Sequence, residues 1–471
     1  MKQPAGWTSP NYLISRYTEH SFMLGILIVY PLFLGVCLAA LFRPWIGLVG
    51  FYGCVLLEPN WNWRWSIPPD FPFQKYIVAS TLIGFLLAGL RGNRLSGSSL
   101  AAVVALLSYL VITFVSLQQT IDVRLSEFYW DSVWKIVLMA ILAIVLLDEP
   151  RKVWICLVVM VLMQGYSAFR INEQYFSDGV SIYAHRAWGT KGDNNLYSNL
   201  TVPIIACSAS VCIFAKKQWL WIGAGIIFIF QLHQLMLLES RGAMLATVGM
   251  MAIFAWYMPR TKFTIWATAL ALIIGAGLAG PPVVKEFTSS FQAEGERDAS
   301  ADSRFKLWKA GWEITLDYPV LGVGPYAGQR LVPQYYEGYG EGTVKGLHNL
   351  FFEITTGSGV VAAIFYFSFF LIPWYLSWRH IRLIGNNPDA PDWLRAILLS
   401  VVAGIPGYLA ASVFSSGSLI ESSYLLASLS LAANSIFSKC GYIEASDDEV
   451  IENETGEYLD LDAPDVGNVH V

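Results

Sequence analysis

Charged residues are scarce in this 471-residue chain, at 14% of the total against roughly 25% in soluble domains. Hydrophobic residues make up 55%. The few charges separate apolar runs of about 17–21 residues, the length at which a helix crosses the hydrocarbon of a bilayer. This scarcity excludes a series of soluble domains and predicts a polytopic membrane protein.

The chain also lacks the spacings of several common sites. Its six cysteines lie mostly in apolar runs without C-x-x-C spacing, so no disulfide framework or metal site is expected. No Walker motif is present, and Gly322–Pro325 lies in a predicted loop without the strand and helix that a nucleotide site needs. No short apolar region precedes a cleavage site, so we expect Ser21–Leu41 to be a retained first span.

The apolar runs predict an all-α bundle of twelve or thirteen transmembrane helices, because backbone groups in lipid must be hydrogen-bonded within the segment. The predicted spans are 22–41, 45–58, 73–90, 98–117, 132–148, 152–169, 195–214, 218–238, 243–258, 263–280, 348–377, 395–415 and 420–437.

Basic residues gather on alternate turns, which the positive-inside rule places in the cytoplasm. They are Arg43, Arg91, Arg94, Arg151, Lys152, Lys216, Lys217, Arg260, Lys262, Arg379, Arg382 and Arg395. The remaining loops are then external: 59–72, 118–131, 170–194, 239–242 and 281–347. Thirteen spans give an external N-terminus, and twelve spans with both ends inside remain the alternative.

This organisation divides the chain into five parts. They are an N-terminal segment 1–20, ten spans within 21–280, a large periplasmic loop 281–347, further spans within 348–437 and an acidic tail 438–471. The tail is poor in aromatic residues, so we expect it to be disordered and cytoplasmic.

Two external segments carry cations that could meet an anion. The first runs from His185 to Asn195 and contains Arg186 and Lys191, for which contact with lipid phosphates is the alternative. The second is the tight turn Glu239–Gly242, where Arg241 has almost no loop through which to reach water. An ionisable residue in such a place is a functional candidate.

The large loop predicts an amphipathic helix on the bilayer surface. Its apolar residues recur at helical spacing, and basic residues would extend from it toward headgroups or substrate. The apolar set is Phe305, Trp308, Trp312 and Leu316, and the basic set is Arg304, Lys306 and Lys309. Tyrosines follow among glycines, including Tyr335, and these could stack on sugars or form an ordinary interfacial loop.

His348 and Asn349 open a long apolar run at the external face. Helix N-termini favour anions, and histidine titrates near neutrality, so His348 could accept a proton from an attacking hydroxyl. His233 lies within a predicted span instead, which favours a packed and hydrogen-bonded role.

With these motifs in order, the chain resembles the O-antigen ligase and O-antigen polymerase superfamily of membrane glycosyltransferases. The resemblance covers about residues 180–370. It rests on Arg186 with the run Gly192–Asn195, Ser240–Gly242, Arg304 to Trp308, Pro319–Gly324, and His348–Glu353 followed by Gly357–Gly359. The family's Pro-Asn pair after the first arginine is replaced here by Asp193–Asn195. The N-terminal part, with Pro44–Leu48 and Phe71–Phe73, looks like the ligase-like branch.

The resemblance implies a donor glycan on undecaprenyl diphosphate, presented at the periplasmic side of the bacterial inner membrane. Arg186 and Arg241 would bind the diphosphate, with the roles of Arg186 and Lys191 left open, and His348 would activate the acceptor hydroxyl. We expect no metal and no cofactor. Further substrate contacts are expected from Lys191, Asn194, Arg304, Tyr335 and Asn349.

Several functions remain open at this point. Ligation to lipid A–core, polymerisation of repeat units and transfer to protein hydroxyls share the same donor chemistry. A polysaccharide transporter or flippase is the alternative from another class, but it predicts charges buried in mid-span and broken helices. The charges here concentrate in loops and turns, which favours the glycosyltransferase.

Overall fold

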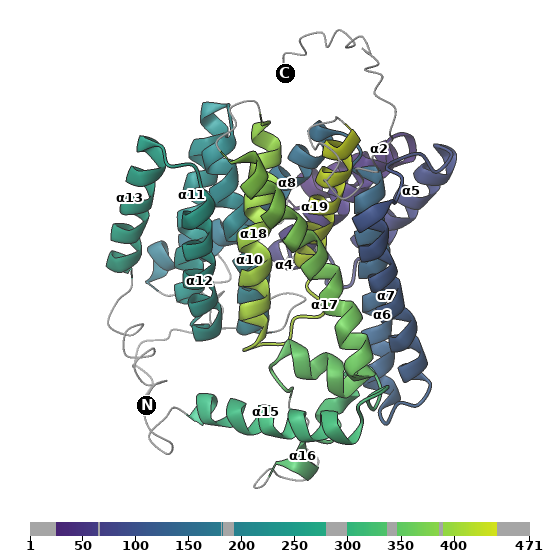
Figure 1. Cartoon of the computed structure of the whole chain (residues 1–471). Helices are drawn as coiled ribbons and strands as arrows, with labels where there is room; N and C mark the ends of the chain where they lie inside the picture. The colour runs from purple at the N-terminus through teal and green to yellow at the C-terminus, as the bar shows by residue number, and fades with distance from the viewer. Residues whose placement is uncertain are drawn as a thin grey trace, which may run out of the picture.

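The computed structural model describes residues 25–64, 66–179, 181, 193–278, 299–336, 346–385 and 390–439. These residues form helices and no strands, and the chain is a polytopic all-α membrane protein, as predicted (Figure 1). The predicted segment 1–20 and nearly all of the predicted tail 438–471 lie outside the described residues.

The helices keep the numbering of Figure 1. They are η1 (Gly25–Val29), α2 (Tyr30–Phe42), α3 (Pro44–Leu57), α4 (Pro59–Asn62), α5 (Phe73–Leu87), α6 (Gly97–Leu117), α7 (Val123–Leu146), α8 (Pro150–Asp178), α10 (Asn194–Phe214), α11 (Gln218–Leu237), α12 (Arg241–Tyr257), α13 (Lys262–Leu278), α15 (Ala299–Asp317), η2 (Ala327–Arg330), α16 (Val332–Tyr335), α17 (Leu350–Ile384), α18 (Asp392–Ser412) and α19 (Glu421–Lys439).

A helix coincides with each predicted span. Among the described residues, seven helices are long and apolar enough to cross a membrane: α6, α7, α8, α10, α11, α17 and α18. Three of them extend well beyond the predicted bounds, because α7 begins at Val123, α8 continues to Asp178 and α17 continues to Ile384. Helix α3 has 14 residues. That gives about 21 Å, short of a hydrocarbon core of roughly 30 Å, so the choice between twelve and thirteen spans stays a prediction.

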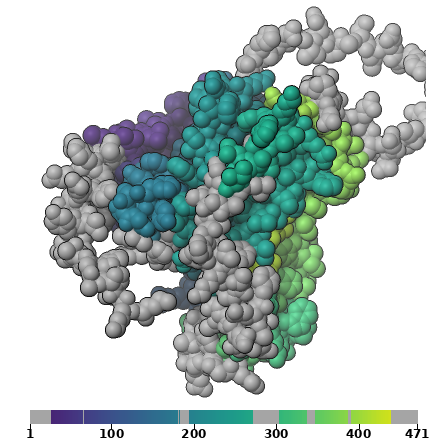
Figure 2. Space-filling view, turned by 90° about the vertical axis from the view of Figure 1, so that its left-hand side faces the viewer, coloured from purple at the N-terminus to yellow at the C-terminus, as the bar shows by residue number. Residues whose placement is uncertain are grey.

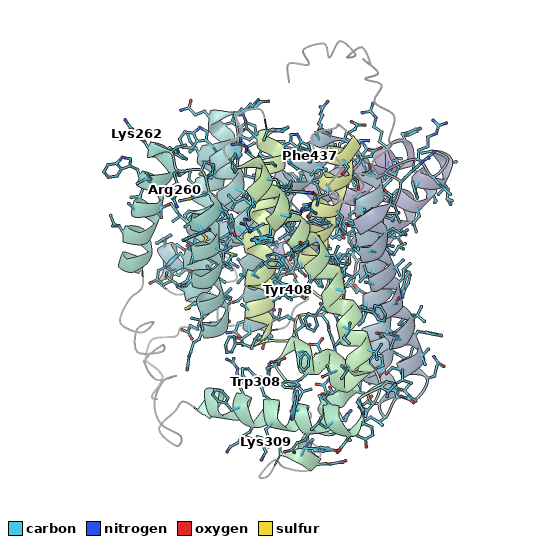
Figure 3. The ribbon with its side chains drawn as sticks, viewed as in Figure 1. Arg260, Lys262, Trp308, Lys309, Tyr408 and Phe437 are labelled. Atoms are coloured by element: carbon cyan, nitrogen blue, oxygen red, sulfur yellow. The ribbon has the colours of Figure 1, made fainter. Side chains whose placement is uncertain are left out.

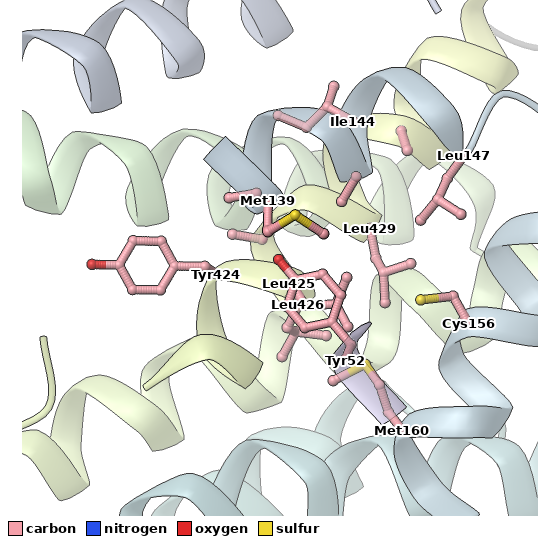
Figure 4. Packing of buried hydrophobic residues seen from close by; sticks show 14 of the residues in the cluster. Tyr52, Met139, Ile144, Leu147, Cys156, Met160, Tyr424, Leu425, Leu426 and Leu429 are labelled. Carbon is pink, nitrogen blue, oxygen red and sulfur yellow. The ribbon is translucent and has the colours of Figure 1, made fainter. Parts of the chain in front are cut away.

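The centre of the bundle is built on α10 and α18, which are buried along most of their length and pack on each other. A Cβ at Gly404 would lie 3.3 Å from the Pro203 carbonyl oxygen and 2.8 Å from Leu426, so α10, α18 and α19 meet closely there. A second part of the core lies where α3, α7, α8 and α19 meet, around Tyr52, Cys156 and Leu425 (Figure 4).

The predicted cytoplasmic and external residues lie at opposite ends of this bundle. Arg260 and Lys262 are at one end, whereas Trp308 and Lys309 are at the other (Figure 3). In the side view of Figure 2, the teal surface of residues 218–278 lies above the green surface that belongs to the α15 end. We call the end that carries Trp308 the α15 end.

Helix α15 lies across its end of the bundle, roughly at right angles to the long helices (Figure 1). A helix is therefore present where the amphipathic helix is predicted, and its contact with the bilayer surface stays a prediction. Leu307, Ala310 and Ile314 are fully buried, whereas Phe305, Trp312 and Leu316 are between 52% and 61% exposed. The reason is that α15 packs on α17 through its small residues: a Cβ at Gly311 would lie 2.8 Å from the Phe352 ring.

The segment after α15 is fastened to α17 by backbone hydrogen bonds. Val323 and Gly324 donate to the carbonyls of Thr356 (2.9 Å) and Gly357 (3.0 Å), and Val360 donates to the Pro319 carbonyl at 2.8 Å. Helix α17 is interrupted at Gly359, which has φ +89°. A Cβ there would lie 2.0 Å from the Val320 carbonyl oxygen, so this crossing requires glycine.

Candidate functional site

Asn349 caps the start of α17. Its side-chain oxygen accepts hydrogen bonds from the backbone N–H groups of Phe351 (2.9 Å) and Phe352 (3.2 Å). His348, just before this cap, is half-buried and has the left-handed φ of +48°. Leu347 is buried among apolar residues of α15 and of the segment that follows it. The histidine is thus held between a helix cap and a buried leucine.

A second set of polar residues lies where α10, α11 and α12 meet. Asp193 caps α10, accepting hydrogen bonds from the backbone of Asn195 (2.8 Å) and Leu196 (3.0 Å). The Asn194 amide donates to the Leu238 carbonyl at 2.7 Å, and the Ser240 hydroxyl donates to the Asn195 side chain at 2.9 Å. These bonds hold the start of α10 beside the turn that carries Arg241. We call residues 193–195 and 238–242 the arginine junction.

The arginine junction adjoins α15 through one aromatic contact. A Cβ at Gly242 would lie 2.5 Å from the Cβ of Phe414, so α12 begins directly against the loop between α18 and α19. The ring centroid of Phe414 lies 5.8 Å from that of Trp308, on α15. Arg304 is one helical turn before Trp308 and is half-buried. Arg241 and Arg304 therefore belong to adjoining elements at the α15 end.

A buried carboxyl connects the histidine to this region. Glu353, in the first turn of α17, is 7% exposed, and its Oε1 accepts a hydrogen bond from the Ser418 hydroxyl. Its Oε2 has no hydrogen-bond partner in the described parts of the chain. Glu353 and Ser416 line an open hollow of about 230 Å³, together with Tyr326, Gly328, Gln329, Gly346, Leu347 and Thr356.

Tyr326 is electrostatically coupled to both sets of residues. Burial raises the pKa of its hydroxyl, and the nearby carboxyls of Glu353 and Asp193 raise it further. The phenol therefore stays protonated at neutral pH and can donate a hydrogen bond. Asp193 belongs to the arginine junction and Glu353 to the start of α17, so carboxyls of both regions act electrostatically on Tyr326.

The other predicted site residues have more local positions. The Tyr335 hydroxyl donates to the Asp317 carboxylate at 2.6 Å, and this bond, with some burial, raises the pKa of Tyr335 to about 12. Its predicted contact with sugar stays a prediction. Arg186 and Lys191 lie outside the described residues. His233 lies 2.5 Å from the side-chain oxygen of Asn172 and stacks on Phe176, in agreement with the packed role favoured by its position.

Sequence reasoning assigned no role to Glu353 and included Tyr326 only among several tyrosines that could stack on sugars. A signal was available for Glu353, because it is an acidic residue near the start of a long apolar run, and an ionisable residue there is a functional candidate. No comparable signal marked Tyr326, one of 23 tyrosines. Its importance comes from the residues that surround it in the fold.

The described part of the chain contains no group of three or more His, Cys, Asp or Glu side chains placed to hold a metal ion. The charged and polar groups of the α15 end are instead a histidine, two arginines, a buried carboxyl and several amides and hydroxyls. Such a set can bind an anion and a neighbouring hydroxyl.

Comparison with known families finds one match. Residues 224–367 match the family model described as O-Antigen ligase. No curated protein matches the chain. The matched stretch begins in α11 and ends in α17, and it therefore contains Arg241, α15, Tyr326, His348 and Glu353. This match supports membership of the O-antigen ligase superfamily.

Proposed function

We propose that the chain is an O-antigen ligase-like glycosyltransferase of the ligase-like branch. It would move a glycan from undecaprenyl diphosphate to an acceptor hydroxyl, on the periplasmic side of the bacterial inner membrane. The family match supports glycosyl transfer from a lipid-linked donor in general. The observation that carries the proposal is that the loop between α18 and α19 contacts both regions: its Phe414 lies against Gly242 of the arginine junction, and its Ser418 bonds to Glu353 at the start of α17.

The proposed reaction joins the acceptor oxygen to the anomeric carbon of the donor sugar. The bond between that carbon and the diphosphate oxygen breaks, and its electron pair stays on the diphosphate. Arg241 would bind this leaving group together with Arg186, because a guanidinium stays charged and can form two parallel hydrogen bonds to phosphate oxygens. These bonds would strengthen as negative charge develops, which lowers the barrier.

His348 would take the proton of the acceptor hydroxyl on a ring nitrogen. A general base contributes roughly 10²–10⁴-fold to rate when it is held within hydrogen-bond reach of the proton. The Asn349 cap and the buried Leu347 on either side of His348 support such a fixed position. Since the arginines supply the positive charge, we propose that transfer needs no divalent metal.

Turnover by the purified protein in nanodiscs tests this proposal. The donor is an undecaprenyl-diphosphate glycan, the acceptors are lipid A–core, a growing polymer and a peptide with hydroxyl side chains, and excess chelator is present. We expect release of undecaprenyl diphosphate and transfer to one acceptor class, which also distinguishes ligase, polymerase and protein O-oligosaccharyltransferase. Transport of intact donor without bond cleavage would identify a flippase. Loss of transfer in chelator, restored by magnesium, would contradict the metal-independent mechanism.

A further inference from the structure

The hollow beside Glu353 has the construction of a small binding site. Its floor has room for roughly one water-sized group. Glu353 lines it, and the Oε2 atom of this almost completely buried side chain has no hydrogen-bond partner among the described residues. Leaving a buried polar atom unpaired has an energetic cost. A hydrogen-bond donor entering the hollow would remove that cost.

The carboxyl is held in place from behind. The Ser418 hydroxyl donates to Oε1, while the Ser416 hydroxyl and the backbone of Gly417 and Ser418 also approach the group. Two buried tyrosines in turn hold this loop: Tyr408 donates to the Gly417 carbonyl at 2.9 Å, and Tyr424 donates to the Ser418 carbonyl at 2.8 Å. The carboxyl is thus fixed through Oε1, and Oε2 has no partner among the described residues.

The opposite wall of the hollow is equally fixed. A Cβ at Gly328 would lie 2.1 Å from the Thr356 hydroxyl oxygen, so η2 rests directly on α17. The Thr356 hydroxyl donates to the Phe352 carbonyl at 2.6 Å and keeps its lone pairs as acceptors. The Tyr326 hydroxyl is protonated at neutral pH and can donate. The hollow therefore offers both donors and acceptors, as a hydroxyl group requires.

We infer that this hollow binds one hydroxyl group of the acceptor sugar, with the Oε2 atom of Glu353 accepting its hydrogen bond. The inference rests on the proposed function. The hydroxyl is a different one from the attacking hydroxyl, because the hollow is lined by Gly346 and Leu347 and not by the side chain of His348. Glu353 is then a specificity-determining residue that selects sugars with a hydroxyl at a fixed offset from the reacting one.

Sugar binding to the full chain in nanodiscs tests this inference without relying on turnover. The probes are the methyl glycosides of glucose, galactose and N-acetylglucosamine, each with its monodeoxy analogues, and binding is measured by saturation-transfer NMR. In the wild type, removal of one particular hydroxyl should weaken binding about fivefold or more, the effect of leaving one buried polar atom unpaired. In Glu353→Gln, the parent sugar and that deoxy analogue should bind with nearly equal affinity.

The matched control is Glu313→Gln, the same change on an exposed part of α15, which should keep the wild-type discrimination. If Glu353→Gln fails to fold, Tyr326→Phe removes another polar group from the same hollow and should reduce the discrimination. Equal binding of all analogues to the wild type, unchanged discrimination in the folded hollow variants, or no saturable binding of any parent sugar would overturn the inference. Donor turnover without discrimination would leave the proposed function standing, whereas discrimination without turnover would reject only that function.

Discussion

The α15 end contains two regions that are held in place by different kinds of bond. Residues 319–330, which we call the glycine loop, are fixed by backbone hydrogen bonds to α17 and by two serines: Ser116 donates to the carbonyls of Leu321 (2.7 Å) and Gly357 (2.8 Å), and Ser126 donates to the Pro325 carbonyl at 2.7 Å. The arginine junction is held together by the side chains of Asp193, Asn194 and Ser240.

This difference teaches which substitutions each region tolerates. Backbone bonds survive most changes of side chain, so the glycine loop should be sensitive only where close approach demands glycine. A side-chain hydrogen bond is lost when that side chain is substituted, so each substitution in the arginine junction should remove one bond and weaken the junction by a small amount. Under the proposed function, His348, which accepts the proton, lies on the rigid side of the site with the glycine loop. Arg241, which binds the diphosphate, lies on the adjustable side in the arginine junction.

The largest effect is expected from Gly359→Ala. The new Cβ would lie 2.0 Å from the Val320 carbonyl at a φ of +89°, so the crossing of α17 and the glycine loop must separate. We expect loss of more than about 4 kcal/mol or failure to fold, measured as apparent unfolding temperature and monodisperse yield. Gly249→Ala is the control, because nothing lies within 4 Å of its Cβ position. Near-normal stability of Gly359→Ala would show that the glycine loop is not rigid.

His348→Ala tests the rigid side chemically. We expect normal insertion and folding, with turnover reduced by roughly 10²–10⁴-fold because the general base is missing. His348 has a φ of +48°, at which alanine is strained whereas asparagine is tolerated, so His348→Ala changes the backbone energy as well as the side chain. His348→Asn therefore separates backbone strain from chemistry and should be equally inactive. Normal transfer by either variant would remove His348 from the mechanism.

Arg241→Lys tests the adjustable side while the charge is kept. Lysine cannot form the two-pronged contact, so we expect a loss of roughly 3–4 kcal/mol of transition-state stabilisation, or about 10²–10³-fold. The loss should appear mainly in turnover, because charge develops as the glycosyl bond breaks. Donor affinity and turnover are measured separately. Near-normal turnover would make Arg241 a general anchor for headgroups.

Ser240→Ala removes one side-chain bond from the arginine junction, the 2.9 Å contact with Asn195. We expect a loss of about 1 kcal/mol in stability, together with a moderate fall in turnover. Ser132→Ala serves as the control, since that hydroxyl is exposed and bonds only within its own helix. Equal stability and turnover of the two variants would contradict the view that side-chain bonds hold the arginine junction together.

The smallest effect concerns the outer edge of the glycine loop, where Arg330 pairs with Asp122. The backbone N–H of Leu125 and then the Arg330 guanidinium lower the pKa of the Asp122 carboxyl. A lowered pKa adds stability above the ordinary value of about 3.9, and this is lost as pH falls through the folded-state value. Asp122→Asn should therefore cost less than about 1 kcal/mol at pH 7, because the pair is partly solvent-exposed. The difference from wild type should shrink below about pH 4, as measured by unfolding temperature against pH. A constant difference would contradict the assignment.

Much of the fold could be predicted because the relevant signal is local. Hydrocarbon forces an apolar run to form a helix, so the positions of α6, α10 or α17 depend on the run itself. Helix ends were less certain: α7 begins at Val123 within a predicted loop, because Asp122 caps it and its polar first turns are still helical. The individual candidates Arg241 and His348 were also local inferences, from an isolated charge and an isolated imidazole beside apolar runs.

The sequence by itself thus determined the membrane class, the helices and several chemically capable residues. Only the tertiary structure decided which of them meet. Glu353 bonds to Ser418, 65 residues away, and shares its surroundings with Tyr326, on a separate loop. It also decided that α15 buries Leu307 and Ile314 against the protein and leaves Trp312 exposed. The physical reason is that the hydropathy of a segment indicates only whether that segment lies in lipid or in water. Which distant residues become neighbours depends on how closely the backbones of different segments pack, as at Gly328 and Gly359.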